Sequence, residues 1–378
     1  MLLLLLVEIP DSVKQRFREI PAGQSYGFIG ERKLIWKSAI AVWKEEPVYG
    51  VGPDHFDFRF RKHRDLWLQT LPRRTHNDYL QLLADLGLVG ASLGALFLVA
   101  VAYGLIRAWP HLGREESSFE MAPGSTRLAW AVGAAAGILF LMIHSAVEFN
   151  LFLPAIGVAV SLLFGVSAAS LRFAGRATGR SLGSVGRGLG LATGLAFSCV
   201  FLWAAARAGA ESRHLLAASR EPGENEVRAA LIRLAISAEP ANPESRFALG
   251  ENLRMRSFEA GDGFETLAQE AIESLEASVR LNPWEPYTHA RLAMCLDWLG
   301  RQVEAGTRME TALKLDPNNK RIVTLMGWHY LHTGDLAKAR EQLERAHNRI
   351  PHARDPLSGI LLQRVDEMIE GRNPVPKR

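Results

Sequence analysis

The chain has 378 residues, a formal net charge of +4 and 48% hydrophobic residues, and this length predicts two or three domains. The small net charge gives no support for nucleic-acid binding, and two distant cysteines, Cys199 and Cys295, predict neither a metal site nor a structural disulfide. Residues 88–208 are almost without charge outside two short loops, whereas residues 211–378 have the composition of a soluble helical protein. We therefore expect an all-α chain whose multi-span transmembrane domain is followed by a soluble helical domain.

The chain begins with an apolar run, residues 1–7. Seven residues are too few to cross a hydrocarbon core, which requires about 20. The run also lacks the basic start and the longer core of a signal peptide. We interpret residues 1–7 as the stub of a transmembrane helix and expect a truncated N-terminus.

Residues 8–87 form a polar segment that we expect to be one large extramembrane loop. Within it, residues 30–46 have helical spacing, with Trp36, Ile40 and Trp43 on one face and Pro47 after the end. These tryptophans fit packing or anchoring at a membrane interface. Arg32, in the first turn, is either a solvated helix residue or a phosphate ligand.

Basic residues dominate the chain between residues 58 and 76, where Asp65 is the one acid; they are Arg59, Arg61, Lys62, Arg64, Arg73 and Arg74. Such an excess beside a membrane attracts anionic lipid head groups. Guanidinium groups also offer paired donors to a pyrophosphate. Most charge runs are solvated surfaces, and we single out Arg74 because it is close to His76.

His76-Asn77 follows this basic run and precedes a long apolar stretch that begins beyond Gly87. Histidine is the side chain best suited to exchange a proton near neutral pH. The alternative is a histidine that merely caps a helix at a membrane surface. The preceding arginines, the adjacent Asn77 and the spacing to Gly87 favour a functional residue.

Residues 88–208 contain four apolar segments of about the length needed to cross a membrane, at 88–107, 128–148, 151–171 and 189–206. The loop at 172–187 has four arginines and no acid, which predicts a cytoplasmic location. Residues 8–87 and the C-terminal half would then both be extracytoplasmic. His144 and Glu148 are four residues apart and are expected to share a helix face, either as a site or as a hydrogen-bonded pair at the outer interface.

Prolines at a regular spacing mark the C-terminal half, and they are Pro240, Pro283, Pro317 and Pro351. The last two gaps are both 34 residues, the period of tetratricopeptide repeats. We expect these repeats over residues 211–353 as an α-solenoid, followed by a last helix and tail at 354–378. Such stacks bind a peptide or protein on a concave surface. Trp284, Trp298 and Trp328 are interpreted as packing residues.

The N-terminal part resembles O-antigen ligases and the related polymerases over about residues 30–165. The resemblance rests on six positions and one dipeptide of this sequence, namely Arg32, Trp36, Pro47, Gly50, Gly52, Phe56 and His76-Asn77. A second match, residues 144–150 with Pro154, resembles a short segment that re-enters the membrane in family members with C-terminal repeats.

The resemblance implies a multi-pass protein of the cytoplasmic (inner) membrane, with periplasmic repeats, that moves a glycan from a polyprenyl-pyrophosphate carrier to an acceptor hydroxyl. His76 would be the base or acceptor-orienting group, Arg32 and Arg74 the ligands of the donor phosphates, and Arg73, Asn77 and Tyr79 substrate-binding residues. No cofactor or metal is expected. The acceptor could be a lipid A core, a growing glycan or a protein, and the repeats would recruit a protein partner. The alternative is a non-catalytic, membrane-anchored repeat scaffold for cell-envelope polysaccharide assembly.

Overall fold

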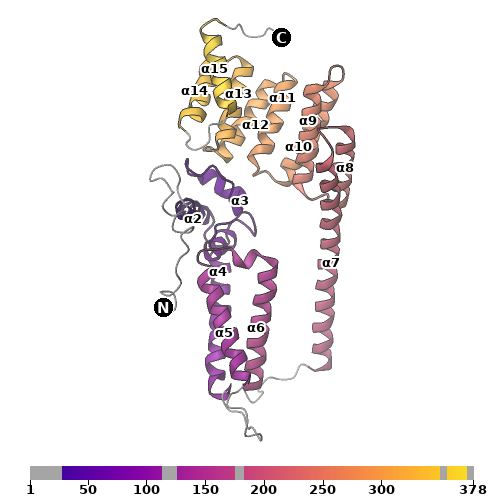
Figure 1. The fold of residues 1–378 in the computed structure, drawn as a ribbon. Coiled ribbons are helices and arrows are strands. Elements are labelled where there is room, and N and C mark those ends of the chain that lie inside the picture. The colour runs from indigo at the N-terminus through magenta and orange to yellow at the C-terminus, as the bar shows by residue number, and fades with distance from the viewer. Residues whose placement is uncertain (1–27, 113–125, 175–182, 350–355, 373–378) are drawn as a thin grey trace, which may run out of the picture.

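The computed structural model describes residues 28–112, 126–174, 183–349 and 356–372 (Figure 1). The expected helix stub at residues 1–7 lies outside these ranges. Helices make up all the regular secondary structure of the described ranges, which contain no strand. The all-α prediction is therefore confirmed for this part of the chain.

A small apolar core organises the first extramembrane segment, which contains α2 (Phe28–Glu45), α3 (Phe56–Arg59) and η2 (Phe60–His63). α2 ends two residues before Pro47, close to the predicted boundary. Ile40, on the expected apolar-aromatic face, is 40% exposed, and the buried residues of α2 are Ile35, Ala39 and Val42. These three lie one position away on the helix, where they pack against Phe56, Phe60 and Leu68. Trp36 and Trp43 instead donate their ring N–H groups to the backbone carbonyls of Thr75 and Pro47.

Four apolar helices follow, and their bounds are α4 (Asp78–Leu112), α5 (Thr126–His144), α6 (Pro154–Ala174) and α7 (Ser184–Arg220), with a short η3 (Asn150–Phe152) before α6. Two segments are long and apolar enough to cross a membrane, Asp78–Arg107 and Ser184–Arg220. Their most apolar windows are exposed on the protein surface, as lipid-facing helices require. The apolar parts of α5 and α6 are shorter, and the expected count of four spans stays a prediction.

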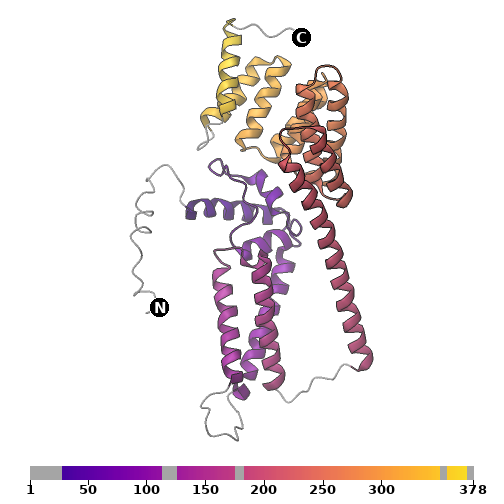
Figure 2. The same cartoon turned by 45° about the vertical axis from the view of Figure 1, so that its right-hand side comes forward.

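The apolar helices have a common orientation (Figures 1 and 2). α4, α5 and α6 form a bundle in which α6 contacts both others, while α7 stands apart and leads up to the C-terminal helices. One end of this set of helices contains the C-terminal ends of α4 and α6 and the N-terminal ends of α5 and α7. α2, α3, η2 and the C-terminal helices lie together at the other end.

α4 is kinked at Gly87, where the chain passes closely over residues 47–52. Gly87 has φ 60° and ψ −160°, outside the helical region. Leu88 and Val89 donate backbone hydrogen bonds to Pro47 and Val48, at 2.9 and 3.0 Å. A Cβ at Gly87 would lie 2.4 Å from the carbonyl oxygen of Val48. This crossing fixes the start of the membrane helix against the extramembrane segment.

The C-terminal half is a stack of helix pairs, and its helices are α8 (Glu226–Ala238), α9 (Pro243–Glu259), α10 (Phe264–Leu281), α11 (Pro286–Trp298), α12 (Gln302–Leu315), α13 (Lys320–Thr333), α14 (Leu336–Glu344) and α15 (Pro356–Ile369). The π-helical turn η4 (Arg345–Arg349) extends α14. Asn242 and Asn319 cap α9 and α13 by accepting backbone hydrogen bonds. Gly250 and Gly327 occupy equivalent positions of two pairs, and a Cβ at either would lie 2.6 Å from a leucine of the paired helix. This repetition explains the predicted pattern of small residues where helices cross.

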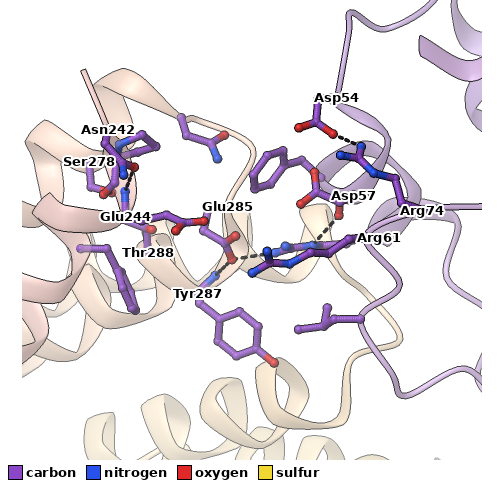
Figure 3. Close-up of a pocket in the computed structure, with 16 residues that line it drawn as sticks. Asp54, Asp57, Arg61, Arg74, Asn242, Glu244, Ser278, Glu285, Tyr287 and Thr288 are labelled. Atoms are coloured by element: carbon purple, nitrogen blue, oxygen red, sulfur yellow. Dashed lines mark hydrogen bonds and ion pairs between the residues drawn. The ribbon is translucent and has the colours of Figure 1, made fainter. Parts of the chain in front are cut away.

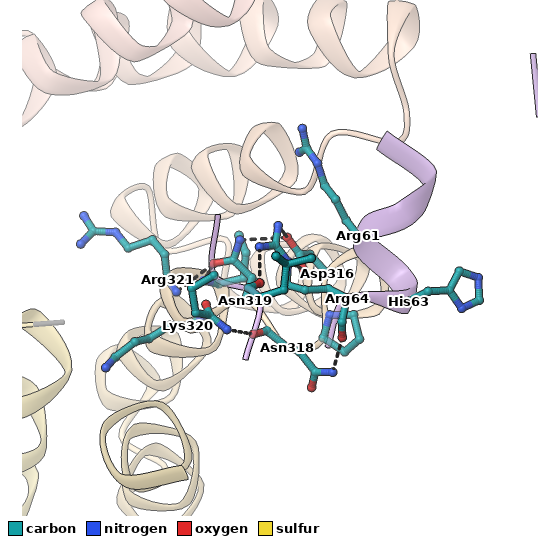
Figure 4. Close-up of polar contacts among 12 residues, drawn as sticks. Arg61, His63, Arg64, Asp316, Asn318, Asn319, Lys320 and Arg321 are labelled. Carbon is teal, nitrogen blue, oxygen red and sulfur yellow. Dashed lines mark hydrogen bonds and ion pairs between the residues drawn. The ribbon is translucent and has the colours of Figure 1, made fainter. Parts of the chain in front are cut away.

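The repeats are docked on the basic part of the extramembrane segment (Figure 4). Arg64 donates two hydrogen bonds to Asp316, at 2.8 and 3.0 Å, and both side chains are fully buried. Asn318 donates to the backbone carbonyl of Arg64 at 2.7 Å. Arg61 is paired with Glu285 at 2.7 Å. Two arginines of the charge run, Arg61 and Arg64, are therefore part of an internal interface, because each is paired with a carboxylate of the repeats.

Trp284, which the sequence predicts as a packing residue of the repeats, lies at this same interface. The Arg59 guanidinium lies 4.1 Å from the centre of its ring, a distance at which a cation is attracted to an indole face. Arg59 is also bound by Glu45, together with Lys62 and His63. Burial acts to raise the pKa of Glu45, but hydrogen bonds from Lys62, Arg59 and His63 outweigh it and lower that pKa to about 2.

Candidate functional site

Asn77 begins α4 and ties it to the segment between α5 and α6. Its side-chain oxygen accepts hydrogen bonds from the backbone N–H groups of Tyr79 and Leu80, both at 3.0 Å, which is the usual pattern of an N-cap. Its amide nitrogen donates to the carbonyl of Ala146 at 2.9 Å. Both the oxygen and the nitrogen of the Asn77 amide are therefore hydrogen-bonded to backbone groups, a structural role that the sequence did not indicate. The predicted contact of Asn77 with substrate stays a prediction.

His76, the residue before this cap, has a positive φ of 52°, which is uncommon for a residue with a side chain. Its neighbours hold that conformation. The Thr75 N–H donates to Gln81 at 2.9 Å and the Thr75 carbonyl accepts from Trp36 at 2.9 Å. The edge-to-face contact of the imidazole with Phe149, at 4.9 Å between ring centres, sets its orientation. The fixed turn thus holds His76 half-buried against Phe149.

Glu148 joins two of the residues that sequence analysis singled out. Its Oε2 lies 3.3 Å from Nδ1 of His76, and its Oε1 is bound by the guanidinium of Arg32, which also donates to the carbonyl of Val147. Burial acts to raise the pKa of Glu148, but hydrogen bonds from Arg32 and His76 outweigh it and hold that pKa below its usual value. Arg32 and His76, 44 residues apart in sequence, therefore meet at one carboxylate.

The expected pairing of His144 with Glu148 is wrong. α5 ends at His144, so Glu148 lies in the following turn and not one helical turn further along the same face. Nδ1 of His144 is 2.7 Å from the side-chain amide of Asn150, while Glu148 turns towards His76 and Arg32. The second matching segment, residues 144–150, was the sequence signal for Glu148, but nothing local in it indicates that its partners lie 72 and 116 residues away.

Arg74 lies in a different environment from Arg32. Its guanidinium is paired with Asp54 and lies 4.3 Å from the ring centre of Phe152. Arg74 and Asp54 both line a groove of about 910 Å³ that continues between α4 and α6 and is lined mainly by apolar residues, including Leu82, Leu83, Leu98, Val160 and Phe164. We call this the apolar groove. Arg74 is thus a cation at the polar end of a hydrophobic groove.

The two other predicted substrate-binding residues lie on opposite sides of Arg74. Tyr79 lines the apolar groove, and its hydroxyl donates to the carbonyl of Met142 at 2.7 Å. Arg73 is exposed and lines a second cavity, between the extramembrane segment and the repeats. His76 lines neither cavity, although it is two residues from both Arg74 and Asp78, which line the groove.

Within the described ranges, no group of three or more His, Cys, Asp or Glu side chains is placed to hold a metal ion. Two carboxylates beside the predicted site are each bound to a cation of the protein, Glu148 to Arg32 and Asp54 to Arg74. The chemistry that this arrangement offers is therefore a hydrogen-bonded imidazole beside several guanidinium groups. Such an arrangement suits proton transfer and the binding of phosphate oxygens.

Comparison with known families finds one match in each half of the chain. Residues 1–112 match the family described as O-antigen ligase. The resemblance of the N-terminal part to O-antigen ligases is confirmed. Residues 302–356 match the tetratricopeptide repeat, which confirms the repeats predicted from the 34-residue period. The ligase match contains Arg32, Arg74 and His76 but ends before Glu148.

No curated protein matches this chain. Among solved structures, a thermophilic tetratricopeptide-repeat protein of Thermus thermophilus is 19% identical, covering 38% of this chain and 72% of that chain, with a TM-score of 0.34.

Proposed function

We propose that this protein transfers a glycan from a polyprenyl-pyrophosphate carrier to an acceptor hydroxyl at the outer face of the cytoplasmic membrane, as an O-antigen ligase or polymerase does. One observation carries the proposal: Arg32 and His76, both inside the matched residues 1–112, meet at Glu148 beside the end of the apolar helices. The chain would be a metal-independent glycosyltransferase. The acceptor would be a lipid A core, a growing glycan or a protein, and these three acceptors distinguish a ligase, a polymerase and a protein-glycosylating enzyme.

His76 would act as the general base. Because the pKa of Glu148 is lowered, its carboxylate is ionised near neutral pH and accepts a hydrogen bond from Nδ1–H of His76. The proton of a neutral imidazole is then on Nδ1, which leaves the lone pair of Nε2 to take a proton from the acceptor. Glu148 would be a positioning residue that also stabilises the imidazolium formed in the reaction, as the carboxylate of a catalytic triad does.

The donor would lie with its polyprenyl chain in the apolar groove and its pyrophosphate beside Arg74. The acceptor oxygen forms a bond to the anomeric carbon while the bond from that carbon to the phosphate oxygen breaks. The acceptor proton goes to His76, and the polyprenyl pyrophosphate leaves with the bonding electron pair. Arginines stabilise the charge that develops on the leaving group. Arg74 would do so from the groove, Arg73 from the neighbouring cavity, and Arg32, held next to His76 by Glu148, would be the third phosphate ligand.

The proposal includes a division of the chain along the membrane normal. Residues 8–87 and the repeats would be periplasmic, residues 88–208 would form four transmembrane helices, and residues 354–378 would be a terminal helix and tail. Support comes from the location of the extramembrane segment and the repeats at the same end of the apolar helices (Figure 1). The arginine-rich loop at 172–187 would then be at the cytoplasmic end, as expected from its charge.

His76→Ala at the native locus tests the proposal. We expect the lipid-linked donor to accumulate and the transferred glycan to fall by at least about 100-fold, because general bases contribute that much. Lipid-linked and surface glycans are quantified together, with the protein level measured by immunoblotting. His214→Ala, on α7 and outside both cavities, is the matched control and should leave both glycan pools unchanged.

An unchanged glycan profile in His76→Ala, at an equal protein level, would contradict glycosyl transfer by this site. The scaffold alternative makes the opposite prediction. In that case an interaction phenotype survives His76→Ala and disappears when residues 240–353 are deleted.

A further inference from the structure

A cavity of about 740 Å³ lies between the extramembrane segment and the repeats (Figure 3). We call it the interdomain cleft. On one side are Asp54, Asp57, Phe58, Arg61, Arg73 and Arg74; on the other are the first turns of α9 and α11, with Glu244, Phe247, Glu285 and Tyr287.

The two walls of the cleft are joined by specific buried contacts. Arg61, with a side chain that is 8% exposed, spans from one wall to Glu285 on the other at 2.7 Å (Figure 3). Glu285 also caps α11 by accepting the backbone N–H of Tyr287. The fully buried pair of Arg64 with Asp316 lies behind this contact. The cleft is therefore a built feature of the fold and not a gap between loosely associated parts.

The interdomain cleft meets the apolar groove at one point. Arg74 and Asp54 line both cavities, and they are paired with each other. A chain bound in the cleft would therefore end beside the guanidinium that we assign to the donor pyrophosphate, two residues from His76. An acceptor needs this position, because its hydroxyl must reach both the anomeric carbon and the base.

The lining of the cleft is suited to a neutral, hydroxyl-rich ligand. Four carboxylates and three guanidinium groups line it, so their charges nearly cancel and favour neither a strongly acidic nor a strongly basic ligand. Phe58, Phe247 and Tyr287 offer flat apolar surfaces for the C–H faces of sugar rings, while Asn242, Asn282 and the carboxylates offer donors and acceptors for hydroxyls.

Asp57 provides a second, independent indication of a ligand. Its Oδ1 is buried and has no hydrogen-bond partner within the described part of the protein, and buried polar atoms of this kind call for an explanation. Burial raises the pKa of Asp57 to about 6. A carboxyl group in this state can both accept from and donate to sugar hydroxyls near neutral pH.

We infer that the interdomain cleft is the acceptor site, and that it binds the acceptor through a neutral oligosaccharide chain. The repeats thus form one wall of the substrate site, in addition to recruiting a protein partner. The assignment of the bound glycan as the acceptor rests on the proposed function, but binding of a glycan in the cleft can be measured without transfer.

The test is a binding experiment with the full chain in detergent micelles. The probe is the neutral oligosaccharide fraction released by mild acid from the surface polysaccharide of the native host. Glu244→Trp fills the cleft from an exposed position on α9, and we expect it to raise the dissociation constant at least tenfold. Glu259→Trp, the same change at an exposed position at the far end of α9, is the matched control and should bind normally.

Asp57→Asn is the second variant, because it preserves the shape of the side chain. It removes the charge and should weaken binding several-fold, with the thermal unfolding curve confirming that the protein is folded. Absence of glycan binding to the unmodified protein would overturn the inference. Unchanged glycan binding in Glu244→Trp would also overturn it. A third contrary result would be that the cleft binds peptides from a digest of the host's envelope proteins and that Glu244→Trp abolishes this binding.

His76→Ala separates this inference from the proposed function. We expect it to bind the oligosaccharides normally, because His76 does not line the cleft, and to lose transfer. If His76→Ala keeps transfer while Glu244→Trp still loses binding, the transfer mechanism fails and the glycan site stands. If His76→Ala loses transfer and Glu244→Trp binds normally, the mechanism stands and the cleft is not the acceptor site.

Discussion

Arg64 and Asp316, 252 residues apart in sequence, form a two-point ion pair that is completely buried. Arg64 belongs to the segment that precedes the membrane helices, and Asp316 follows α12 of the repeats. Asn319 also donates to Asp316, at 2.8 Å. Through this pair the repeats are fastened to the part of the chain that bears His76, which makes their position relevant to the proposed reaction.

Removal of the Asp316 side chain should destabilise the interface between the repeats and the extramembrane segment. In Asp316→Ala the Arg64 guanidinium stays buried without its counter-ion, a change that costs about 3–5 kcal/mol of stability in comparable cases. Thermal unfolding and limited proteolysis of the full chain in detergent measure the effect. Arg301→Ala breaks an exposed pair with Glu304 and should leave the unfolding temperature nearly unchanged, because solvent screens such pairs. Equal unfolding temperatures for the two variants would show that the buried pair does not hold the repeats in place.

Gly87→Ala should destabilise the junction between α4 and the extramembrane segment. The new Cβ would lie 2.4 Å from the Val48 carbonyl oxygen, and the φ and ψ of Gly87 fall in a region that only glycine adopts readily. We expect a loss of at least about 3 kcal/mol. Gly133→Ala, within α5, has no neighbouring atom within 4 Å of the new Cβ and should be neutral or slightly stabilising. A Gly87→Ala protein as stable as Gly133→Ala would refute the close crossing.

Glu148→Gln should reduce glycan transfer by about 100-fold if Glu148 orients His76 for proton transfer. His144→Ala is the matched control, because His144 is close in sequence but is bound to Asn150, and it should retain most of the transfer. A purely structural role is distinguished by the kinetics and stability of the purified protein. In Glu148→Gln kcat should fall while KM and the unfolding temperature stay unchanged, because glutamine keeps the shape of the side chain. A loss of transfer that comes with a lower unfolding temperature would assign Glu148 to structure alone.

Asp57→Asn should stabilise the protein at pH 7 and have little effect at pH 4. The pKa of Asp57 is about 6 in the folded protein, above the ordinary value of 3.8, so the folded state holds the proton more tightly than the unfolded state. The stability that this gives is present below pH 3.8 and is lost as the pH rises through 6. Because Asp57 is only half-buried, solvent screening reduces the gain from the variant at pH 7 to about 1 kcal/mol.

Unfolding temperatures of both proteins between pH 4 and 8 check this prediction. The low pKa of Glu45, about 2, makes stability fall at more acidic pH in both proteins alike, so it cancels in the difference. A constant difference across this range would show that Asp57 does not titrate there.

Local features were predictable where the physical signal is itself local. The end of α2 near Pro47 follows from the missing N–H and fixed φ of proline. The helix pairs α11–α12 and α13–α14 follow from a 34-residue repeat of small and large residues. Helical spacing placed Trp36, Ile40 and Trp43 on one face of α2 but did not indicate that Ile35, Ala39 and Val42, which have the same spacing, form the core. Helical spacing cannot choose between two such faces when both are apolar.

The amino-acid sequence alone was enough to establish an all-helical chain, an O-antigen-ligase-like segment that contains Arg32 and His76, and tetratricopeptide repeats at the C-terminus. Periodicity, capping residues and motif spacing carry that information, and all three act over a few helical turns. Only the tertiary structure decided that Glu148 binds both Arg32 and His76, and that Arg64 and Asp316 fasten the repeats over the site. Contacts between residues 72 to 252 positions apart depend on the path of the whole chain. The sequence around an arginine does not show which distant carboxylate it pairs with.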